Sequence, residues 1–326
     1  MSTIISENTT TKTQFLTDTI TGLKAEPKYM HSKYFYDERG DYIFQQIMNM
    51  DEYYLTDAEM DILSNQSQQL SAIISSIDGA FDLIELGAGD ATKSIHLLRA
   101  LVNQDSDFTY FPIDISEHVI SSLEETLPVE LPGLKMQGLN GDYFEMLKSA
   151  SEISDKRKVV LFMGANIGNM NVNDARNFCK KLRNQLTQND LLIIGFDLKK
   201  NPQQILSAYN DRAGITRSFN LNLLSRINRE LNGDFELENF EHYASYDPET
   251  GACKSYLVSL KKQSVQIGDE QIEFAENEHI FMEISQKYAL TEIEGLAKSV
   301  GFQPVQNLFD KNRYFVDSVW QVEPHH

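Results

Sequence analysis

Four short and almost uninterrupted apolar segments, each followed by a pattern of helical period, constrain the fold of this chain more than any other feature. They span residues 81–86, 108–114, 158–163 and 190–197. Strands that are apolar at nearly every position are typical of a sheet covered on both faces, and strands that alternate with helices form parallel sheets. The sequence therefore predicts an α/β domain built on a mostly parallel sheet.

The alternation of strands and helices stops after residue 197 and resumes near residue 288. The intervening residues 199–287 contain two helical stretches followed by shorter β-like runs. We therefore expect one domain from residues 56–198 and 288–326, interrupted by an insertion. A second domain is expected from residues 15–55 and 199–287, in which the tyrosine-rich N-terminal helices pack with the insertion.

The charge and composition of the chain exclude several classes of protein. Its 29 basic and 48 acidic residues give a net charge of −19, which repels phosphate backbones and argues against a nucleic-acid partner. No apolar run approaches the ~18 residues of a membrane-spanning helix. Two cysteines cannot build a disulfide framework. We expect a cytoplasmic, monomeric, globular protein that acts on a small molecule.

The histidines of the chain are scattered, and no two of them stand at the spacing of metal ligands on one helix face. We therefore predict no metal site. The terminal His325-His326 pair is compatible with a native end or with the remnant of a tag.

A helix start is predicted at Thr56-Asp-Ala-Glu59, whose residue types spell a capping box. In that motif the Thr and Glu side chains bond reciprocally to unpaired amides of the first turn. Little apolar periodicity precedes Phe15, so the first helical pattern is expected only after that residue.

A glycine loop follows the first predicted strand, with the sequence Glu85-Leu-Gly87-Ala-Gly89. A strand that ends in Gly-x-Gly before a helix lets a ligand approach the backbone and meet the helix N-terminus. A dinucleotide fold requires a third glycine where Thr92 stands, and the acids Glu85 and Asp90 would repel a pyrophosphate. S-adenosylmethionine suits the loop better, although a plain tight turn is the alternative.

Acids also end the next predicted strand, 108–114, and a short strand-like segment at residues 136–142. Asp114 has the position at which doubly wound folds place a carboxylate on ribose hydroxyls, and Asp142 precedes Tyr143, so that acid and ring are suited to an adenine. Each Asp is equally suited to a turn or a helix cap. After the segment 158–163, Gly164-Ala-Asn-Ile-Gly-Asn169 forms a bent polar loop that is suited either to a substrate or to capping the next helix.

Several motifs, taken together in their order and spacing, resemble the L-histidine Nα-methyltransferases of the ergothioneine pathway, enzymes that trimethylate free histidine. The resemblance extends from about residue 28 to residue 322. The motifs that carry it are Lys33–Asp37 with Gly40, Asp51–Glu59, Glu85–Gly89 with Lys93, Gly164–Asn169, Ala208–Asp211, Phe219-Asn220 with Asn228–Leu231, and Glu283–Ser285.

The resemblance implies a Rossmann-like class I fold dependent on S-adenosylmethionine, a mostly parallel sheet with closing antiparallel strands, and a smaller α+β substrate-binding domain. The expected cofactor residues are Gly87, Gly89, Lys93, Asp114, Asp142 and Tyr143. Tyr36, Asn169 and Tyr209 are expected to fix the carboxylate and amine region of the substrate, with Gly164 beside the reacting centre. Tyr53, Glu283 and Ser285 are expected to recognise the imidazole.

Two departures from the family pattern leave the substrate more open than the reaction. Ala165-Asn166 replaces the Ser-Thr that is common in the family, and Ser255 stands where histidine enzymes can carry a pocket methionine. A smaller residue there admits a larger side chain, so a tryptophan-derived amine is an alternative substrate. A sensor without turnover is a second alternative. A nicotinamide-dependent oxidoreductase is a third, disfavoured by the missing glycine.

Overall fold

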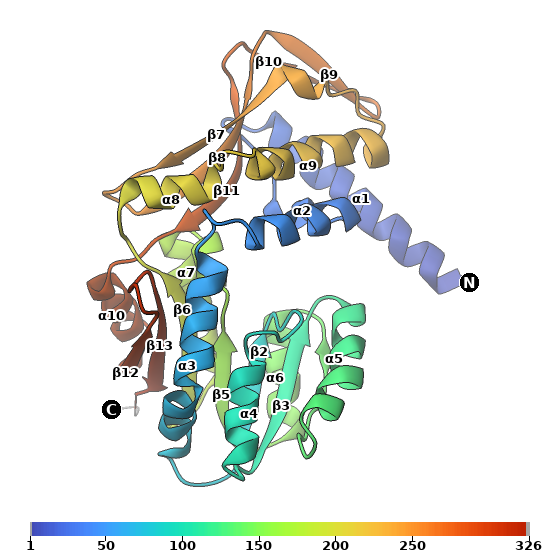
Figure 1. Cartoon of the computed structure of the whole chain (residues 1–326). Helices are drawn as coiled ribbons and strands as arrows, with labels where there is room; N and C mark the ends of the chain where they lie inside the picture. Colours follow the sequence, from blue (N-terminus) through green and yellow to red (C-terminus); the bar gives the residue numbers. More distant parts are fainter. Residues whose placement is uncertain (1, 324–326) are drawn as a thin grey trace. The chain divides into compact units, whose positions relative to one another are not determined.

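The computed structural model describes the backbone of residues 2–323 and the side chains of residues 12–323 (Figure 1). The His325-His326 pair lies outside the described residues. The chain divides into two compact units. The large unit comprises Leu55–Lys199 and Gln286–His326, and the small unit comprises Met1–Tyr54 and Lys200–Ser285.

A seven-stranded sheet forms the centre of the large unit, in the order β12-β13-β6-β5-β2-β3-β4. Its strands are β2 (Phe81–Leu86), β3 (Phe108–Asp114), β4 (Leu139–Asn140), β5 (Arg157–Phe162), β6 (Leu191–Asp197), β12 (Phe302–Phe309) and β13 (Phe315–Val322). Strands β4, β3, β2, β5 and β6 pair in parallel, and β13 runs antiparallel to both of its neighbours. The prediction of a mostly parallel sheet is confirmed.

Helices cover both faces of this sheet, as Figure 1 shows. They are α3 (Leu55–Ser75), α4 (Ile95–Asn103), α5 (Glu117–Glu130), α6 (Tyr143–Ile153), α7 (Val172–Gln185) and α10 (Leu290–Ser299), with a short 3-10 turn, η2 (Asn166–Asn169). Side chains of α6, α7 and α10 share one core cluster with the sheet, around Phe162, Phe178 and Trp320. Every residue of β2 and of β6 is buried, which explains why these segments are apolar at nearly every position.

The predicted strands 81–86 and 108–114 coincide with β2 and β3, and the other two agree with β5 and β6 within one residue at each end. Ser116 caps α5, because its Oγ accepts a hydrogen bond from the Val119 amide at 3.3 Å. These features depend on neighbours in the chain, and the sequence pattern therefore predicts them well.

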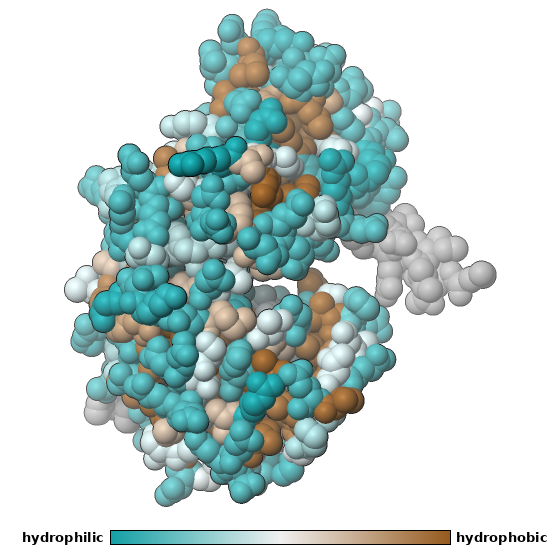
Figure 2. Space-filling model, viewed as in Figure 1, coloured by the Kyte–Doolittle hydropathy of each residue, from teal (hydrophilic) through white to brown (hydrophobic). Residues whose placement is uncertain are grey.

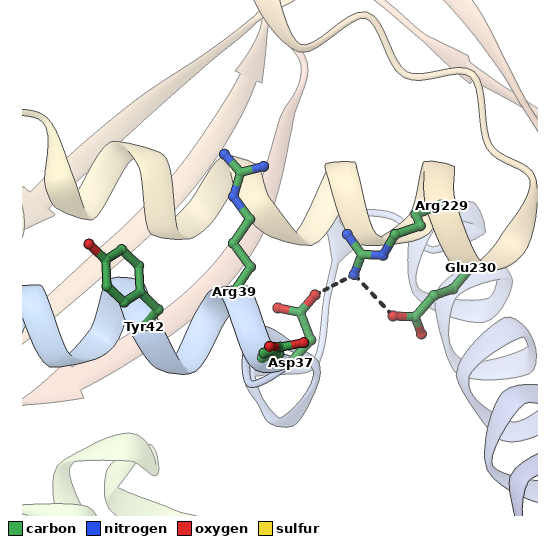
Figure 3. A pocket seen from close by; sticks show the side chains of 6 residues that line it. Asp37, Arg39, Tyr42, Arg229 and Glu230 are labelled. Carbon is green, nitrogen blue, oxygen red and sulfur yellow. Dashed lines mark hydrogen bonds and ion pairs between the residues drawn. The ribbon is translucent and has the colours of Figure 1, made fainter.

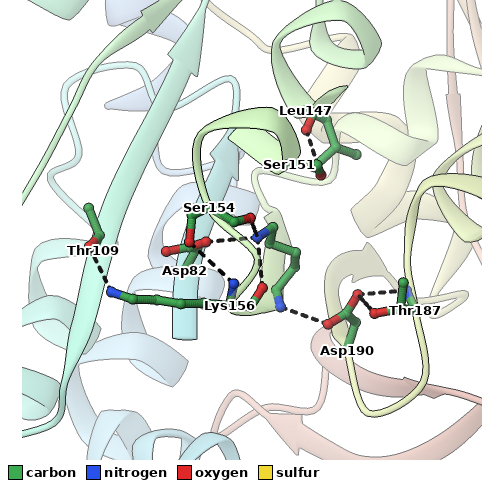
Figure 4. Close-up of polar contacts among 9 residues, drawn as sticks. Asp82, Thr109, Leu147, Ser151, Ser154, Lys156, Thr187 and Asp190 are labelled. Carbon is green, nitrogen blue, oxygen red and sulfur yellow. Dashed lines mark hydrogen bonds and ion pairs between the residues drawn. The ribbon is translucent and has the colours of Figure 1, made fainter. Parts of the chain in front are cut away.

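A network of hydrogen bonds and one ion pair lies near the amino ends of β2 and β5 (Figure 4). Lys158 Nζ donates to Asp82 Oδ2 at 2.8 Å and to the carbonyls of Ser154 and Lys156 at 2.6 and 2.7 Å. Asp190 Oδ1 accepts from the Lys158 amide at 2.7 Å. Lys158 and Asp82 are both buried, and a buried charge is tolerated when it is paired and hydrogen-bonded in this way.

The small unit combines a four-stranded sheet, a hairpin and helices. The sheet has the order β1-β11-β8-β7, and β9 pairs with β10. The elements are α1 (Ser2–Lys24), β1 (Lys28–Tyr29), η1 (Ser32–Phe35), α2 (Glu38–Met48), α8 (Pro202–Tyr209), α9 (Ile215–Leu231), η3 (Leu237–Asn239), β7 (Phe240–Tyr246), β8 (Ala252–Ser259), β9 (Gln263–Ile267), β10 (Glu270–Phe274) and β11 (His279–Gln286). Strand β11 ends one residue into the large unit.

Helix α9 lies at the centre of the small unit's core. Its Phe219 and Leu223 share a cluster with Phe35, Ile280 and Met282 from other elements. Helix α1 starts well before the first periodic apolar residue of the sequence, which differs from the prediction. Tertiary packing of its second half explains the difference, because Phe15 and Leu23 are buried in the same cluster although the segment has weak helical periodicity.

Most of the surface visible in Figure 2 is hydrophilic on each unit, in keeping with the net charge of −19. Within the described part of the chain, no helix has the length and apolar content that a membrane crossing requires.

Candidate active site

The order of the strands reverses between β2 and β5. From β2 the chain adds β3 and β4 on one side, and it then adds β5 and β6 on the other side. Ligands of doubly wound sheets bind outside the carboxyl ends of the strands at such a point. Gly87 follows β2, Asp114 ends β3, Asp142 follows β4 and Gly164 follows β5. The tertiary structure thus brings these predicted residues to one edge of the sheet.

The loop after β2 has a conformation that requires glycine. Gly87 has a φ of +74°, and a Cβ at this position would lie 2.7 Å from Tyr143 Oη and 3.8 Å from Asn166 Nδ2. Gly89 has a φ of +54°, and nothing lies within 4 Å of the place where its Cβ would be. The loop is therefore tightly packed at its first glycine and open at its second.

The Asp114 carboxylate accepts hydrogen bonds from two backbone amides, one in the glycine loop and one shortly after β3. Its Oδ2 accepts from the Gly89 amide at 3.3 Å, and its Oδ1 accepts from the Ser116 amide at 2.9 Å. The carboxylate thereby fixes the glycine loop relative to β3. The next residue, Ile115, is 84% exposed, which is unusual for a large apolar side chain and places an uncovered apolar surface next to Asp114. No motif of the sequence singles out Ile115.

Asp142 and Tyr143 start helix α6. Asp142 is exposed and caps the helix, because its Oδ1 accepts from the Phe144 amide at 2.9 Å and from the Glu145 amide at 3.4 Å. Tyr143 is half-buried beside Gly87. Loss of hydration and the nearby carboxylates of Asp114 and Asp142 raise the pKa of the Tyr143 phenol above its ordinary value, so the hydroxyl stays protonated at neutral pH.

The loop after β5 has an exposed glycine and an exposed asparagine, Gly164 and Asn169. Gly164 has a φ of +75°, and Ala165 has a φ of +55°. Asn166 is held inside the loop, because its Nδ2 donates to the Met163 carbonyl at 2.9 Å. Capping of helix α7 is performed by Asn171, whose Oδ1 accepts from the amides of residues 173 and 174.

The predicted capping box at Thr56–Glu59 is wrong. Helix α3 already includes Leu55, and the Glu59 side chain points into the interior with a side-chain exposure of 0%. Its Oε2 accepts a hydrogen bond from Lys93 Nζ, and its Oε1 accepts from the Gly164 amide at 2.7 Å. A partner from the tertiary fold therefore replaces the local amide that the motif predicts. The only sequence signal for this role is an acid on the apolar stripe of a helix.

The residues expected to bind substrate in the small unit lie on β11, on α8 and in the segments before and after α2. Glu283 and Ser285 point to the same side of β11, since they are two residues apart on a strand. Tyr209 Oη donates to Ser285 Oγ at 2.7 Å, and the Tyr209 ring meets the Tyr53 ring edge-on at 6.2 Å. Three predicted side chains, Tyr53, Tyr209 and Ser285, are thus connected within one unit, and Glu283 lies on the same side of β11 as Ser285.

Tyr36 lies in the same unit, close enough to Glu283 for the charge of that acid to act on its phenol. Its ring contacts the rings of Phe44 and Phe219 at 5.5 and 5.7 Å. Loss of hydration, followed by the charges of Glu283 and Asp41, raises the pKa of the Tyr36 phenol well above its ordinary value. The hydroxyl is therefore protonated at neutral pH and serves as a hydrogen-bond donor rather than as a base.

An open groove of about 670 Å³ lies on the small unit, and none of the predicted substrate residues lines it (Figure 3). Its lining residues are Asp37, Glu38, Arg39, Tyr42, Arg229 and Glu230. Asp37 pairs with Arg229 there, and it also accepts from the Gly40 amide at 2.8 Å and from Asn222 Nδ2 at 2.8 Å. The charged groups of the groove hold α2 and α9 together. Among the described residues, no cluster of His, Cys, Asp and Glu is arranged to hold a metal ion.

Comparison with known proteins gives a match to a family model that spans nearly all of this chain. The model is described as histidine-specific, S-adenosylmethionine-dependent methyltransferase, and it matches residues 15–322. The histidine N-alpha-methyltransferase of Mycolicibacterium smegmatis is 34% identical over 273 residues, which cover 83% of each chain.

Two further relatives have different names. Ergothioneine biosynthesis protein 1 of Neurospora crassa is 33% identical over 89% of this chain and 33% of its own length. An L-tryptophan methyltransferase of Psilocybe serbica is 28% identical over 83% of this chain and 82% of its own length.

Proposed function

Because this chain belongs to the histidine-specific, S-adenosylmethionine-dependent methyltransferases, we propose that it methylates the α-amino group of L-histidine up to the trimethylated product, hercynine. The observation that carries the choice of substrate is the polar side of β11 in the small unit. There Glu283 stands two residues from Ser285, whose hydroxyl is held by Tyr209 at 2.7 Å. An acid and a hydroxyl at this spacing match the two nitrogens of an imidazole.

The large unit is proposed to hold the cofactor at the carboxyl edge of its sheet. Three observations fit S-adenosylmethionine there. Gly89 leaves open space above the loop, Asp114 presents a carboxylate for the ribose hydroxyls, and Ile115 offers an exposed apolar surface to the adenine ring. The remaining proposed cofactor residues are Gly87, Lys93, Asp142 and Tyr143.

The substrate is proposed to be held at both of its ends. Glu283 accepts a hydrogen bond from one imidazole nitrogen, Ser285 bonds to the other, and Tyr53 packs on the ring. Tyr36, Tyr209 and Asn169 fix the carboxylate and amine region. A substrate without the imidazole edge leaves the Glu283 carboxylate without that partner, which is unfavourable for a partly buried acid.

The chemistry needs little beyond positioning by the protein. When bound, S-adenosylmethionine supplies an electrophilic methyl group, and the attacking amine must be in line with it. The protonated Tyr36 hydroxyl can orient the amine but does not remove its proton, because its pKa is raised. Gly164 has no side chain at the exposed edge after β5, so the reacting amine can come close to the backbone there.

The proposal also covers where and in what form the protein acts. We place the reaction in the cytoplasm and on a free small molecule, with a monomeric enzyme and no nucleic-acid partner. The net charge of −19 supports a small-molecule substrate over a polyanion, and the two cysteines, both buried, are compatible with a reducing compartment.

Mass spectrometry of the products tests the function directly. The purified protein is incubated with S-adenosylmethionine and each of the twenty amino acids separately. We expect methylated histidine as the dominant product, with mono-, di- and trimethyl species appearing in order. A dominant product from tryptophan would favour the second candidate substrate, an amine related to tryptophan. The small, fully buried Ser255 on β8 makes this candidate reasonable. No product from any amino acid, with cofactor binding verified, would contradict histidine as the substrate and favour a non-proteinogenic amine or a sensor without turnover.

Replacing Tyr209 with Phe should weaken histidine binding without affecting the cofactor. The variant removes the hydroxyl that donates to Ser285, and a hydrogen bond of this kind contributes about 1 kcal/mol. We expect the KM for histidine to rise roughly 5- to 10-fold. Steady-state kinetics at saturating S-adenosylmethionine measure it. Tyr243→Phe, at a tyrosine that is 58% exposed on β7, is the matched control and should behave as the wild type. An unchanged KM in Tyr209→Phe would remove Tyr209 from the proposed site.

A further inference from the structure

The Glu59 carboxylate of the large unit connects the loop after β2 with the loop after β5, the two strands between which the strand order reverses. It comes from helix α3, 34 residues before Lys93 and 105 residues before Gly164. One oxygen accepts from the ammonium of Lys93 in the loop after β2. The other accepts from the backbone amide of Gly164 in the loop after β5, at 2.7 Å. A single buried side chain therefore fixes both loops.

The sheet provides space for this carboxylate at Gly195 in the middle of β6. A Cβ at Gly195 would lie 2.4 Å from Glu59 Oε1 and 2.9 Å from the Phe315 ring. Any larger residue would displace the carboxylate or the ring. A glycine inside a strand weakens it unless something approaches the backbone closely, and here Glu59 does so.

A second acid, Asp317 on β13, stands opposite Gly195 in the strand register. Asp317 is fully buried, and among the described residues neither of its carboxylate oxygens has a hydrogen-bond partner. Burial and the charge of Glu59 raise the pKa of Asp317 well above its ordinary value, against the opposing effect of Lys93. The charged form of Asp317 is therefore disfavoured, and the ammonium of Lys93 is paired with Glu59.

The ammonium of Lys93 is directed at the edge where the cofactor is proposed to bind. Its Nζ would lie 3.9 Å from a Cβ built on Gly164, next to the Asn166 amide, which lies near both Gly87 and Gly164. The side chain of Lys93 remains 28% exposed, whereas that of Glu59 is not exposed at all. Glu59 therefore lies beneath the two loops, and the Lys93 side chain that it holds is partly exposed.

We propose that Glu59 is a positioning residue of the cofactor site, which holds the Lys93 ammonium and the Gly164 amide in the arrangement that S-adenosylmethionine requires. This inference rests on the proposed function. If Glu59 had a structural role alone, its substitution would affect only stability, as expected for any other buried acid with a lysine partner. A positioning role adds an effect on cofactor affinity that other buried pairs do not have.

The matched control is the buried pair of Asp82 and Lys158 at the amino ends of the same sheet. It joins an acid and a lysine at 2.8 Å, with side-chain exposures of 1% and 6%. We expect both Glu59→Gln and Asp82→Asn to lower the melting temperature, because each leaves a lysine without its charged partner. Only Glu59→Gln should also lower the affinity for the cofactor.

The decisive measurement is the Kd of S-adenosylhomocysteine, determined by calorimetry on the full-length wild type and on both variants. We expect a 10- to 100-fold weaker Kd in Glu59→Gln, since small displacements of positioned groups have effects of this order. The Kd of Asp82→Asn should be that of the wild type. In Glu59→Gln the KM for S-adenosylmethionine should rise more than kcat falls.

Two results would overturn the proposal: wild-type affinity in Glu59→Gln, or an equal loss of affinity in Asp82→Asn. If Glu59→Gln does not fold, Glu59→Asp provides the test. It keeps the charge but is one methylene shorter and cannot reach both partners, so a 5- to 10-fold loss of affinity is expected, and none would refute the role. Failure of the proposed function is separate, because it would appear as absence of methylated histidine from the wild type, whatever the variants bind.

Discussion

Replacing Gly87 with alanine should nearly abolish cofactor binding while leaving the protein folded. Gly87 has a φ of +74°, in a region that costs an L-residue roughly 1–2 kcal/mol. The new methyl group would also lie 2.7 Å from Tyr143 Oη, so that ring or the loop must move. Both flank the proposed cofactor site. We expect the Kd of S-adenosylhomocysteine to weaken by at least about 100-fold.

Gly133→Ala separates the loss of the site from backbone strain in general. Gly133 lies in the same unit with a φ of +96°, and nothing lies within 4 Å of its missing Cβ. Backbone strain should lower the stability of Gly133→Ala about as much as it lowers that of Gly87→Ala. The affinity of Gly133→Ala for S-adenosylhomocysteine should remain that of the wild type. Calorimetric titration and thermal melting of both variants check the prediction. Wild-type affinity in Gly87→Ala would place the cofactor elsewhere.

Replacing Glu283 with alanine should remove the preference for histidine. A hydrogen bond to a charged group contributes about 1.5–3 kcal/mol, which corresponds to roughly a 10- to 150-fold loss of kcat/KM for histidine. Competition between histidine and other amino acids, followed by mass spectrometry, measures the change in selectivity. Affinity for S-adenosylhomocysteine should remain close to that of the wild type, because Glu283 belongs to the small unit.

The control for this experiment is Glu276→Ala, at an exposed glutamate shortly before β11. It removes the same charge from the same unit without touching the proposed imidazole site, and both activity and selectivity should be unchanged. Equal histidine turnover in Glu283→Ala would show that the imidazole is recognised by other groups. The family membership and the choice of cofactor would be unaffected by that result.

Several residues of the family motifs hold the backbone rather than a ligand in this structure. Asp37 caps α2, and Asp211 accepts from the amides of Ile215 and Thr216 at 2.8 Å each at the start of α9. Asn228 bonds to both backbone groups of Phe235, at 2.8 Å each. The sequence could not separate these roles from binding, because an Asp or Asn at a helix start suits either.

The sequence by itself determined the large sheet, its covering by helices and the order of the glycine loop and acids along the chain. These follow from local patterns: a strand buried on both faces must be apolar throughout, and a left-handed turn after it requires glycine. The four strands predicted from such runs are β2, β3, β5 and β6 within one residue at each end. The glycine loop, Asp114, Asp142 with Tyr143 and the loop from Gly164 to Asn169 followed from this pattern. The roles of Lys93 and of the residues in the small unit came from the resemblance to a family.

Only the tertiary structure decided what Glu59 does. Its sequence neighbours predict a helix cap, but in the fold it meets Lys93 and Gly164, residues far away in the chain. In the same way, Tyr209 and Ser285 are 76 residues apart and share a hydrogen bond at 2.7 Å. A carboxylate or hydroxyl bonds to whichever partner the packed chain brings within reach, and a buried one must find such a partner. No local pattern encodes that choice.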